Sequence, residues 1–195
     1  MLVLLVPAAA FAFDTSRRPA QSEIRIAILR PDVAYDHGRE SSIQALVLRS
    51  LRSELRERGF DAYDAEMTYD EAEQARGEGN VDADYLVEVL GGEAYSDDFG
   101  GIGIGNRNAD VTLAVIASRV AGQLRVYDAR TMDVVANEPI SRRSSALLPT
   151  SVGLGGRDFY ADIALPFVQW AQIRRVAHAA ARDAAEHVTT AVRGQ

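Results

Sequence analysis

The sequence predicts an α+β fold: a mixed, mostly antiparallel sheet with helices packed on one face, in a single domain. Three observations predict it. An apolar strand pattern is followed by an amphipathic helix pattern, several strand patterns then follow one another across short polar turns, and a long helical pattern closes the chain. A chain of 195 residues that is 47% apolar is long enough to bury one sizeable core.

The first two elements are a strand and a helix. Residues 23–29 alternate between polar and apolar side chains and then become continuously apolar, which is typical of a strand that enters the interior of a sheet. Ser41 and Gln44 stand at capping-box spacing, so we expect a helix to start there and to end at Gly59. Its apolar side chains form one stripe. They are Ile43, Val47, Leu48, Leu51 and Leu55.

A short strand and a short helix come next. Residues 60–65 alternate between apolar and acidic side chains, which suits an edge strand. Thr68 and Glu71 repeat the capping-box spacing, so they predict a small helix over residues 69–76.

A series of strands follows. Residues 84–90 are strongly apolar, and Gly91-Gly92 is expected to end or bend that strand. Alternating apolar residues at 111–117 predict another strand, and residues 124–127 and 134–140 predict two more.

The remainder of the chain is predicted to be a loop and then the longest helix. Residues 141–158 have the composition of a loop, and Pro166 suits the first turn of a helix. Apolar residues then recur at helical spacing as far as Gly194, and Trp170 is expected to anchor the core. They are Phe167, Trp170, Ile173, Ala177, Ala180, Ala184, Val188 and Val192.

The amino-terminal segment has the features of a signal peptide. Residues 2–6 form a short apolar run, and residues 10–12 read Ala-Phe-Ala, an A-x-A cleavage pattern. The run is too short to span a membrane, and Pro7 disfavours the alternative of a buried strand. We therefore expect an exported, periplasmic protein with no transmembrane anchor after cleavage. The predicted division is a signal peptide at 1–12, a flexible leader at 13–22 and a single α+β domain at 23–195.

Composition excludes several classes of function. The 21 basic and 28 acidic residues give a net charge of −7, which argues against nucleic acid or anionic lipid as a partner. The absence of cysteine excludes disulfides, thiol catalysis and a lipid-modified cysteine. His178 and His187 stand nine residues apart, on opposite faces of a helix, so they cannot ligate one metal ion together. No cofactor or metal is expected.

A glycine-rich segment at residues 100–105 follows the Asp97-Asp98 pair. Its glycine spacing is not that of a dinucleotide-binding turn, and a strand rather than a helix follows it. Two interpretations stay open: a flexible hairpin connection, or a mobile loop whose apolar side chains add to the sheet edge of a partner. The candidate binding residues are Asp97, Asp98, Gly101, Ile102, Gly103, Ile104 and Gly105.

Several short segments together carry a family resemblance. They are the strand at 24–29, the helix with Leu51 and Leu55, and residues 81–87, 101–105 and 124–131. Most of residues 23–136 resembles the envelope proteins grouped around the curli secretion channel CsgG, the TolB N-terminal domain and the penicillin-binding-protein activator LpoB. The resemblance implies a non-catalytic periplasmic domain that binds other envelope components. Channel and activator members are typically lipoproteins, whereas this chain has no cysteine to carry a lipid.

Three hypotheses for the function follow. The first is an exported binding or assembly domain that contacts envelope proteins through residues 97–108 and the neighbouring sheet edge. The second is a small periplasmic hydrolase that uses His37, beside Asp36, with Ser41 or Ser42, although the motif G-x-S-x-G is absent. The third is a small-ligand carrier with a pocket between the sheet and the final helix.

Overall fold

The structure is a computed structural model that describes residues 24–32, 39–106, 109–154, 157–160 and 165–194. These residues form six strands and three helices. In chain order they are β1 (Arg25–Ile28), α1 (Arg39–Glu57), β2 (Asp61–Asp64), α2 (Tyr69–Gly77), β3 (Tyr85–Asn106), β4 (Ala109–Asp128), β5 (Val134–Leu154), β6 (Arg157–Tyr160) and α3 (Leu165–Arg193).

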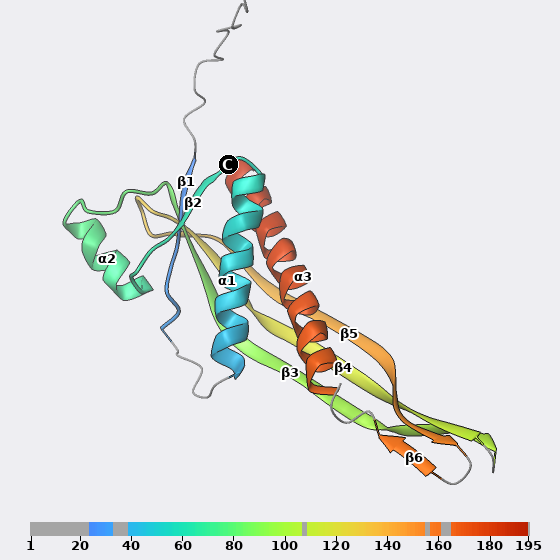
Figure 1. The fold of residues 1–195 in the computed structure, drawn as a ribbon. Helices are drawn as coiled ribbons and strands as arrows, with labels where there is room; N and C mark the ends of the chain where they lie inside the picture. Colours follow the sequence, from blue (N-terminus) through green and yellow to red (C-terminus); the bar gives the residue numbers. More distant parts are fainter. Residues whose placement is uncertain (1–23, 33–38, 107–108, 155–156, 161–164, 195) are drawn as a thin grey trace, which may run out of the picture.

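All the strands belong to one mixed sheet in the order β2-β1-β3-β4-β5-β6. β1 is parallel to β2 and β3, and every other pair is antiparallel. The long helices α1 and α3 lie side by side on one face of this sheet (Figure 1). The α+β class and the mostly antiparallel sheet are therefore confirmed.

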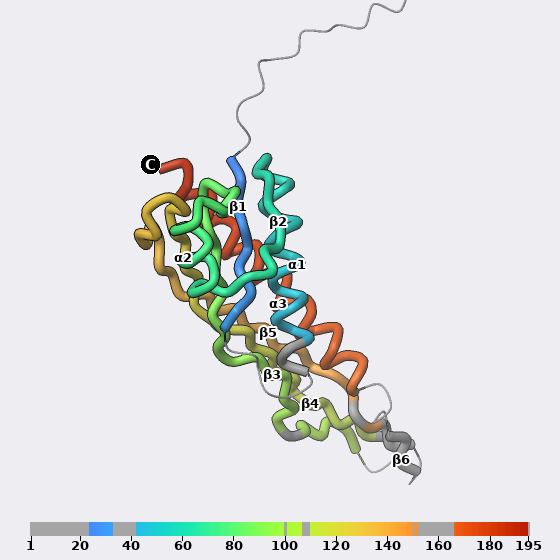
Figure 2. Tube along the Cα trace, turned by 90° about the vertical axis from the view of Figure 1, so that its left-hand side faces the viewer, coloured from blue at the N-terminus to red at the C-terminus, as the bar shows by residue number. Residues whose placement is uncertain are grey.

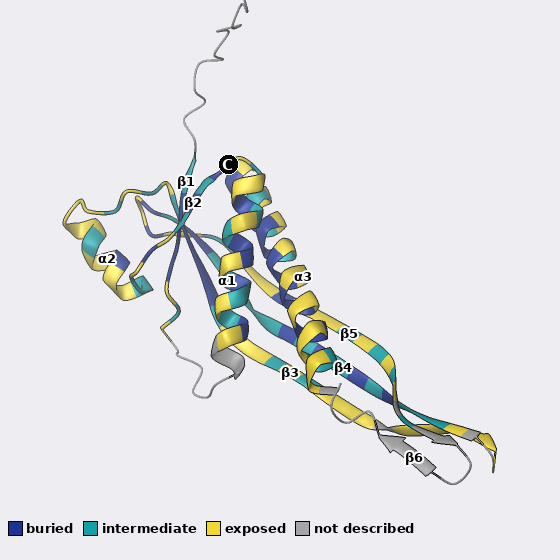
Figure 3. Ribbon diagram, in the orientation of Figure 1, coloured by how far each residue is buried: buried dark blue, intermediate teal, exposed yellow. Residues whose placement is uncertain are grey.

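The main core lies between the sheet and the two long helices. Alternate residues of β1 and β3, such as Ile26 and Val87, point toward the helices and are fully buried. Leu51 and Leu55 of α1 meet them, as the helical period predicts. Figure 3 shows the same division, with the buried residues of α1 and α3 turned toward the sheet. α3 contributes mainly small residues to this core. They are Ala177, Ala180, Ala181, Ala184 and Ala185.

The short helix α2 lies on the opposite face of the sheet from α1 and α3, and Figure 2 shows it from that side. Its Ala72 packs in a second cluster with Ala27, Leu29 and Leu86. The physical reason is the continuously apolar run at the end of β1, because a strand sends successive side chains to opposite faces. That run therefore needs an apolar cover on both faces.

Strands β3, β4 and β5 are 22, 20 and 21 residues long. At about 3.3 Å per residue they span about 66–73 Å, whereas the 29 residues of α3 span about 43 Å. The strands therefore run on past the helices as a three-stranded extension (Figure 1). We call this extension the arm, and it comprises residues 95–106, 109–119 and 143–154.

The arm corrects two expectations. The segment 97–108 was expected to be a loop, but its described part, residues 97–106, belongs to β3. Residues 141–158 were also expected to be a loop, but residues 141–154 belong to β5 and residues 157–158 to β6. Gly91-Gly92 bends β3 without ending it, since the register with β4 shifts between Gly91 and Ala94.

The first turns of α3 correct a third expectation. The helix itself is confirmed, but Trp170 is 40% exposed and Phe167 is 73% exposed. Trp170 lies about two turns before the buried Ala177, on the same side of α3. Trp170 belongs to neither buried cluster of the described residues, so it is not a core anchor.

Candidate functional site

The candidate residues of the glycine-rich segment all lie in β3, within the arm, but on two different faces. A register shift between Phe99 and Gly101 places Phe99 and Ile102 on one face, although they are three residues apart. Arg142 marks the opposite face, because its side chain reaches Asp183 of α3. Asp97, Ile102 and Ile104 lie on the face turned away from α3, which we call the outer face. Asp98, Gly101, Gly103 and Gly105 lie on the face shared with α3.

The outer face of the arm carries rows of apolar side chains. Strand register places Phe99 opposite Val115, and Val115 opposite Leu147. Ile102 lies opposite Leu113 in the next row. The largest of these side chains are exposed to an unusual degree: Phe99 56%, Ile102 58%, Ile104 59% and Leu147 60%. Contiguous apolar surface of this kind is typical of an interaction site.

Among the described residues, the β3 edge of the arm is unpaired along its whole length, and the β5 edge is unpaired as far as residue 150. β1 pairs with β3 only at residues 85–87, so residues 88–106 have no strand on that side. β6 pairs with β5 only at residues 151–154, which leaves residues 134–150 as the other open edge. An open edge presents backbone N–H and C=O groups that another strand can pair with.

A hollow of about 740 Å³ lies at the base of the arm. Strand register places Tyr95, Arg119 and Arg143 in one row across β3, β4 and β5, on the outer face. The guanidinium of Arg119 lies 2.9 Å from the carboxylate of Glu93. The hollow is lined by Tyr95, Phe99, Ala117, Ser118, Arg119, Ser141, Arg143, Ser144 and Ser145. Sequence reasoning missed this site, because it assigned residues 141–145 to a loop.

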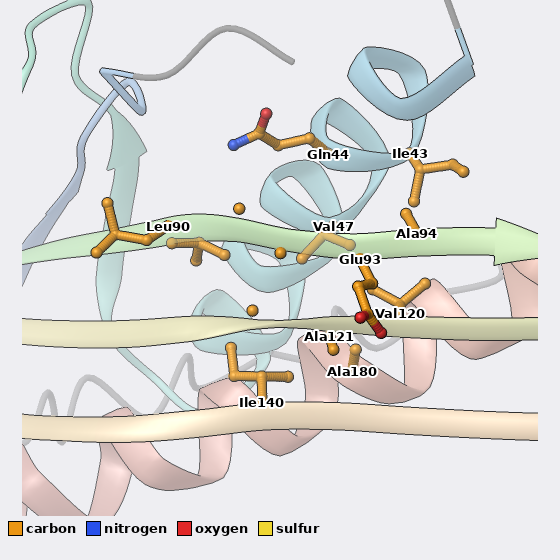
Figure 4. Close-up of a pocket in the computed structure, with 14 residues that line it drawn as sticks. Ile43, Gln44, Val47, Leu90, Glu93, Ala94, Val120, Ala121, Ile140 and Ala180 are labelled. Atoms are coloured by element: carbon orange, nitrogen blue, oxygen red, sulfur yellow. The ribbon is translucent and has the colours of Figure 1, made fainter. Parts of the chain in front are cut away.

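A second, small cavity of about 40 Å³ lies between α1 and the sheet (Figure 4). Ile43, Val47 and Ile140 give it an apolar lining, and the buried side-chain nitrogen of Gln44 has no hydrogen-bond partner among the described residues. Typical ligand pockets measure about 300 Å³ or more, so this cavity has room only for a few water-sized groups. It also lies mainly beside α1, whereas the carrier hypothesis placed a pocket against the final helix.

The residues of the hydrolase hypothesis are not brought together in the described structure. Asp36 and His37 lie outside the described residues. Ser41 is in the first turn of α1, as is Ser42, whose side chain is exposed. The capping prediction was also wrong in register, because α1 starts at Arg39, two residues before Ser41.

One serine–histidine contact does exist, and no motif in the sequence indicated it. The hydroxyl of Ser50 in α1 lies 2.8 Å from Nδ1 of His178 in α3. Ser50 is 7% exposed and lies in the middle of a helix, where backbone N–H groups already donate within the helix. The backbone of α1 therefore offers no free N–H donor to an oxyanion beside Ser50, and the contact is a hydrogen bond between the two helices.

A buried carboxylate lies on the face covered by α2. Glu88 is 2% exposed and accepts a hydrogen bond of 2.9 Å from the hydroxyl of Tyr127. Burial, together with the neighbouring Glu88 carboxylate, raises the pKa of Tyr127 to about 12. The ring of Tyr127 packs on that of Tyr69, with centroids 4.7 Å apart. The Glu88–Tyr127 contact joins β3 to β4 beneath α2. Neither the hollow of the arm nor the cavity beside α1 borders it.

Among the described residues, no group of three or more histidine and acidic side chains is placed to hold a metal ion. None of the helices in the described ranges combines the length and the apolar character needed to cross a membrane.

Comparison with known proteins gives a likeness of fold at low identity. No protein-family model matches the sequence, and no curated protein matches it. A protein from Helicobacter pylori described as a homologue of a neuraminyllactose-binding hemagglutinin is 11% identical over 100% of both chains, with a TM-score of 0.49. A minor lipoprotein from Acinetobacter baumannii is 10% identical over 85% of this chain and 92% of its own, with a TM-score of 0.42. At these values the likeness says nothing about what this protein binds.

Proposed function

We propose that this protein is a non-catalytic binding domain of the bacterial cell envelope that holds a partner protein on its arm. The observation that carries the proposal is the row of apolar side chains on the outer face, four of which are more than half exposed. Burying one such side chain fully is worth about 1.5–3 kcal/mol. Binding of a partner that covers the outer face would be stabilised by this free energy, because these side chains are exposed to water in the isolated chain.

The open edge of β3 favours an extended segment as the part of the partner that binds. Such a segment adds a strand to the sheet, and its alternate side chains then continue the apolar rows of the outer face. The edge carries Glu93, Asp97 and Asp98. The carboxylates of Asp97 and Asp98 form no ion pair with any residue in the described ranges. The segment that fits is therefore extended, apolar at alternate positions and basic near its middle.

Export is part of the same proposal. Residues 1–12 act as a signal peptide, residues 13–22 as a flexible leader and residues 23–195 as the binding domain, which functions in the periplasm. The support is the A-x-A pattern after an apolar run that is too short to span a membrane.

Site-specific photocrosslinking in intact cells tests the partner proposal. A photoreactive amino acid in place of Ile102 should give one discrete crosslinked product, because this position lies on the outer face beside the open edge of β3. The matched control is the same amino acid in place of Val134, which is 55% exposed but lies at the other end of β5.

The identity of the crosslinked peptide decides the outcome. We expect mass spectrometry to find a segment with alternating apolar residues and an arginine or lysine, captured at position 102 and not at 134. Identical products at both positions, or no product at position 102, would contradict a docking role for the outer face.

A further inference from the structure

Apart from Phe99, the residues that line the hollow at the base of the arm have no part in the protein-docking proposal. The hollow's volume of about 740 Å³ falls within the range of about 300–1,000 Å³ that is typical of small-molecule sites. Two aromatic rings, two guanidinium groups and several serine hydroxyls line it. This combination suits a ligand that has both apolar faces and charged or polar groups.

The positions of the two arginines destabilise the protein when no ligand is bound. Arg119 of β4 and Arg143 of β5 are direct cross-strand partners on the same face. Like charges in this arrangement are destabilising. Glu93 offsets the charge of Arg119, at 2.9 Å. Arg143 forms no hydrogen bond or ion pair with any residue in the part of the chain that the structure describes. A bound anion would relieve the repulsion and complete the pairing.

The geometry of the guanidinium group indicates which kind of anion fits the hollow. Its planar fork of N–H donors matches the two oxygens of a carboxylate in a bidentate geometry. Asp97 is on the same outer face but does not line the hollow. It lies on β3, two strands across and two residues along from Arg143, a separation of about 12 Å. The β5 side of the hollow therefore has the stronger attraction for an anion, within a chain of net charge −7.

The remaining lining suits a sugar ring. Tyr95 and Phe99 follow each other along the outer face of β3 and are 38% and 56% exposed. Aromatic faces carry negative charge density, which attracts the polarised C–H groups on the face of a pyranose ring. Ser141 and Ser145 flank Arg143 on β5, and each hydroxyl can both donate to and accept from a sugar hydroxyl.

We propose that this hollow binds a carboxylate-bearing saccharide. Arg143, supported by Arg119, holds the carboxylate, Tyr95 and Phe99 pack against sugar rings, and Ser141 and Ser145 contact ring hydroxyls. The site is separate from the outer-face rows of Ile102 and Ile104, so a saccharide and a protein segment can be tested independently.

Calorimetric titration of the full chain with trigalacturonic acid tests the proposal. We expect saturable binding, and binding at least tenfold weaker to the methyl ester of the same trisaccharide, which keeps the rings and loses the charges. Inorganic phosphate, titrated separately, should bind at least tenfold more weakly than the acid. An ester or a phosphate that binds as tightly as the acid would overturn the assignment, as would no binding of the acid.

Three variants locate the site. Arg143→Gln should weaken binding of trigalacturonic acid at least tenfold, and Tyr95→Ala should also weaken it. Arg174→Gln, at an exposed position on α3 away from the hollow, should leave it unchanged. Arg143 is exposed and its removal relieves a like-charge contact, so the Tm of Arg143→Gln should be no lower than that of the wild type. Wild-type affinity in Arg143→Gln would refute the site.

The two proposals fail in distinguishable ways. Replacing Ile102 and Ile104 by serine should abolish the crosslinked protein product and leave saccharide affinity intact. Arg143→Gln should weaken saccharide binding and leave the crosslinked protein product intact. Saccharide binding that depends on the isoleucines and not on Arg143 would contradict the assignment of the ligand to the hollow.

Discussion

Tyr127 is buried, with 3% of its surface exposed, and donates a hydrogen bond to the carboxylate of Glu88. Its pKa in the folded protein, about 12, lies above the ordinary value of 10. A raised pKa means that folding favours the protonated phenol. The stability that follows is fully present below pH 10 and is lost as the pH rises from about 10 toward 12. Burial also raises the pKa of Tyr63, which acts in the same direction.

Tyr127→Phe should therefore change the pH dependence of stability. At pH 8 the variant should be less stable by about 1–3 kcal/mol, because Glu88 loses its donor in a buried position. Between pH 8 and pH 11 its free energy of unfolding should fall less steeply than that of the wild type. Urea denaturation at the two pH values measures both effects. Parallel decreases in the two proteins would show that Tyr127 does not control the alkaline loss of stability.

Individual side chains also show where the sequence could not indicate the site. Ile102 and Ile104 could be proposed as binding residues because isolated apolar residues between glycines are conspicuous. Arg143 could not, because its partner Arg119 is 24 positions away and the pairing depends on strand register. The Ser-Arg-Arg-Ser-Ser run at 141–145 is typical of a loop, since polar residues dominate it.

The backbones of β3 and β4 leave no room for a side chain at Gly92 and Gly122. A Cβ added at Gly92 would lie 2.4 Å from the carbonyl oxygen of Ala121, and one added at Gly122 would lie 2.7 Å from that of Leu90. Such backbone contacts cannot move aside easily. The bend in β3 therefore depends on the absence of side chains at these positions.

Gly92→Ala should destabilise the protein by roughly 1–3 kcal/mol, because overpacking forces the two backbones apart. The matched control in the same strand is Gly103→Ala, since a Cβ at Gly103 has no atom within 4 Å. That control should change stability by less than about 1 kcal/mol. Urea midpoints at constant m-value measure the difference. Equal effects of the two substitutions would mean that the bend does not need a glycine.

Local patterns predict elements best where the element is regular. The stripe of Ile43, Leu51 and Leu55 gave the helix α1, and the capping box of Thr68 and Glu71 is present at the start of α2. The full length of the long strands could not be predicted from local patterns. Register shifts after Gly91 and Phe99 break the alternation of β3, so its second half has the pattern of a loop.

The whole molecule has a two-part plan: a body with apolar cover on both faces of the sheet and an arm whose outer face has none. The order of strand and helix patterns along the chain was sufficient to predict the α+β class. The arm was not predictable, because it exists only through pairing among β3, β4 and β5. Pro139 and Pro149 also argue locally against a strand in β5, although both lie in it.

The proposed export concerns the whole chain and can be measured directly. We expect the protein recovered from the periplasm of its native host to begin near Phe13, because the A-x-A pattern places cleavage after Ala12. Intact-mass spectrometry of the purified protein gives the amino terminus. Protein that retains residues 1–12 and stays in the cytoplasm would contradict the proposed signal peptide.

The length and strand direction of the arm also determine how it bears mechanical force. Hydrogen bonds between antiparallel strands run perpendicular to the strands. A pull on the tip along the strands therefore loads many of these bonds in shear at once, whereas a sideways pull on one edge would open them one after another. With its base fixed in the packed body, the arm is suited to transmit tension along its length to whatever its tip holds.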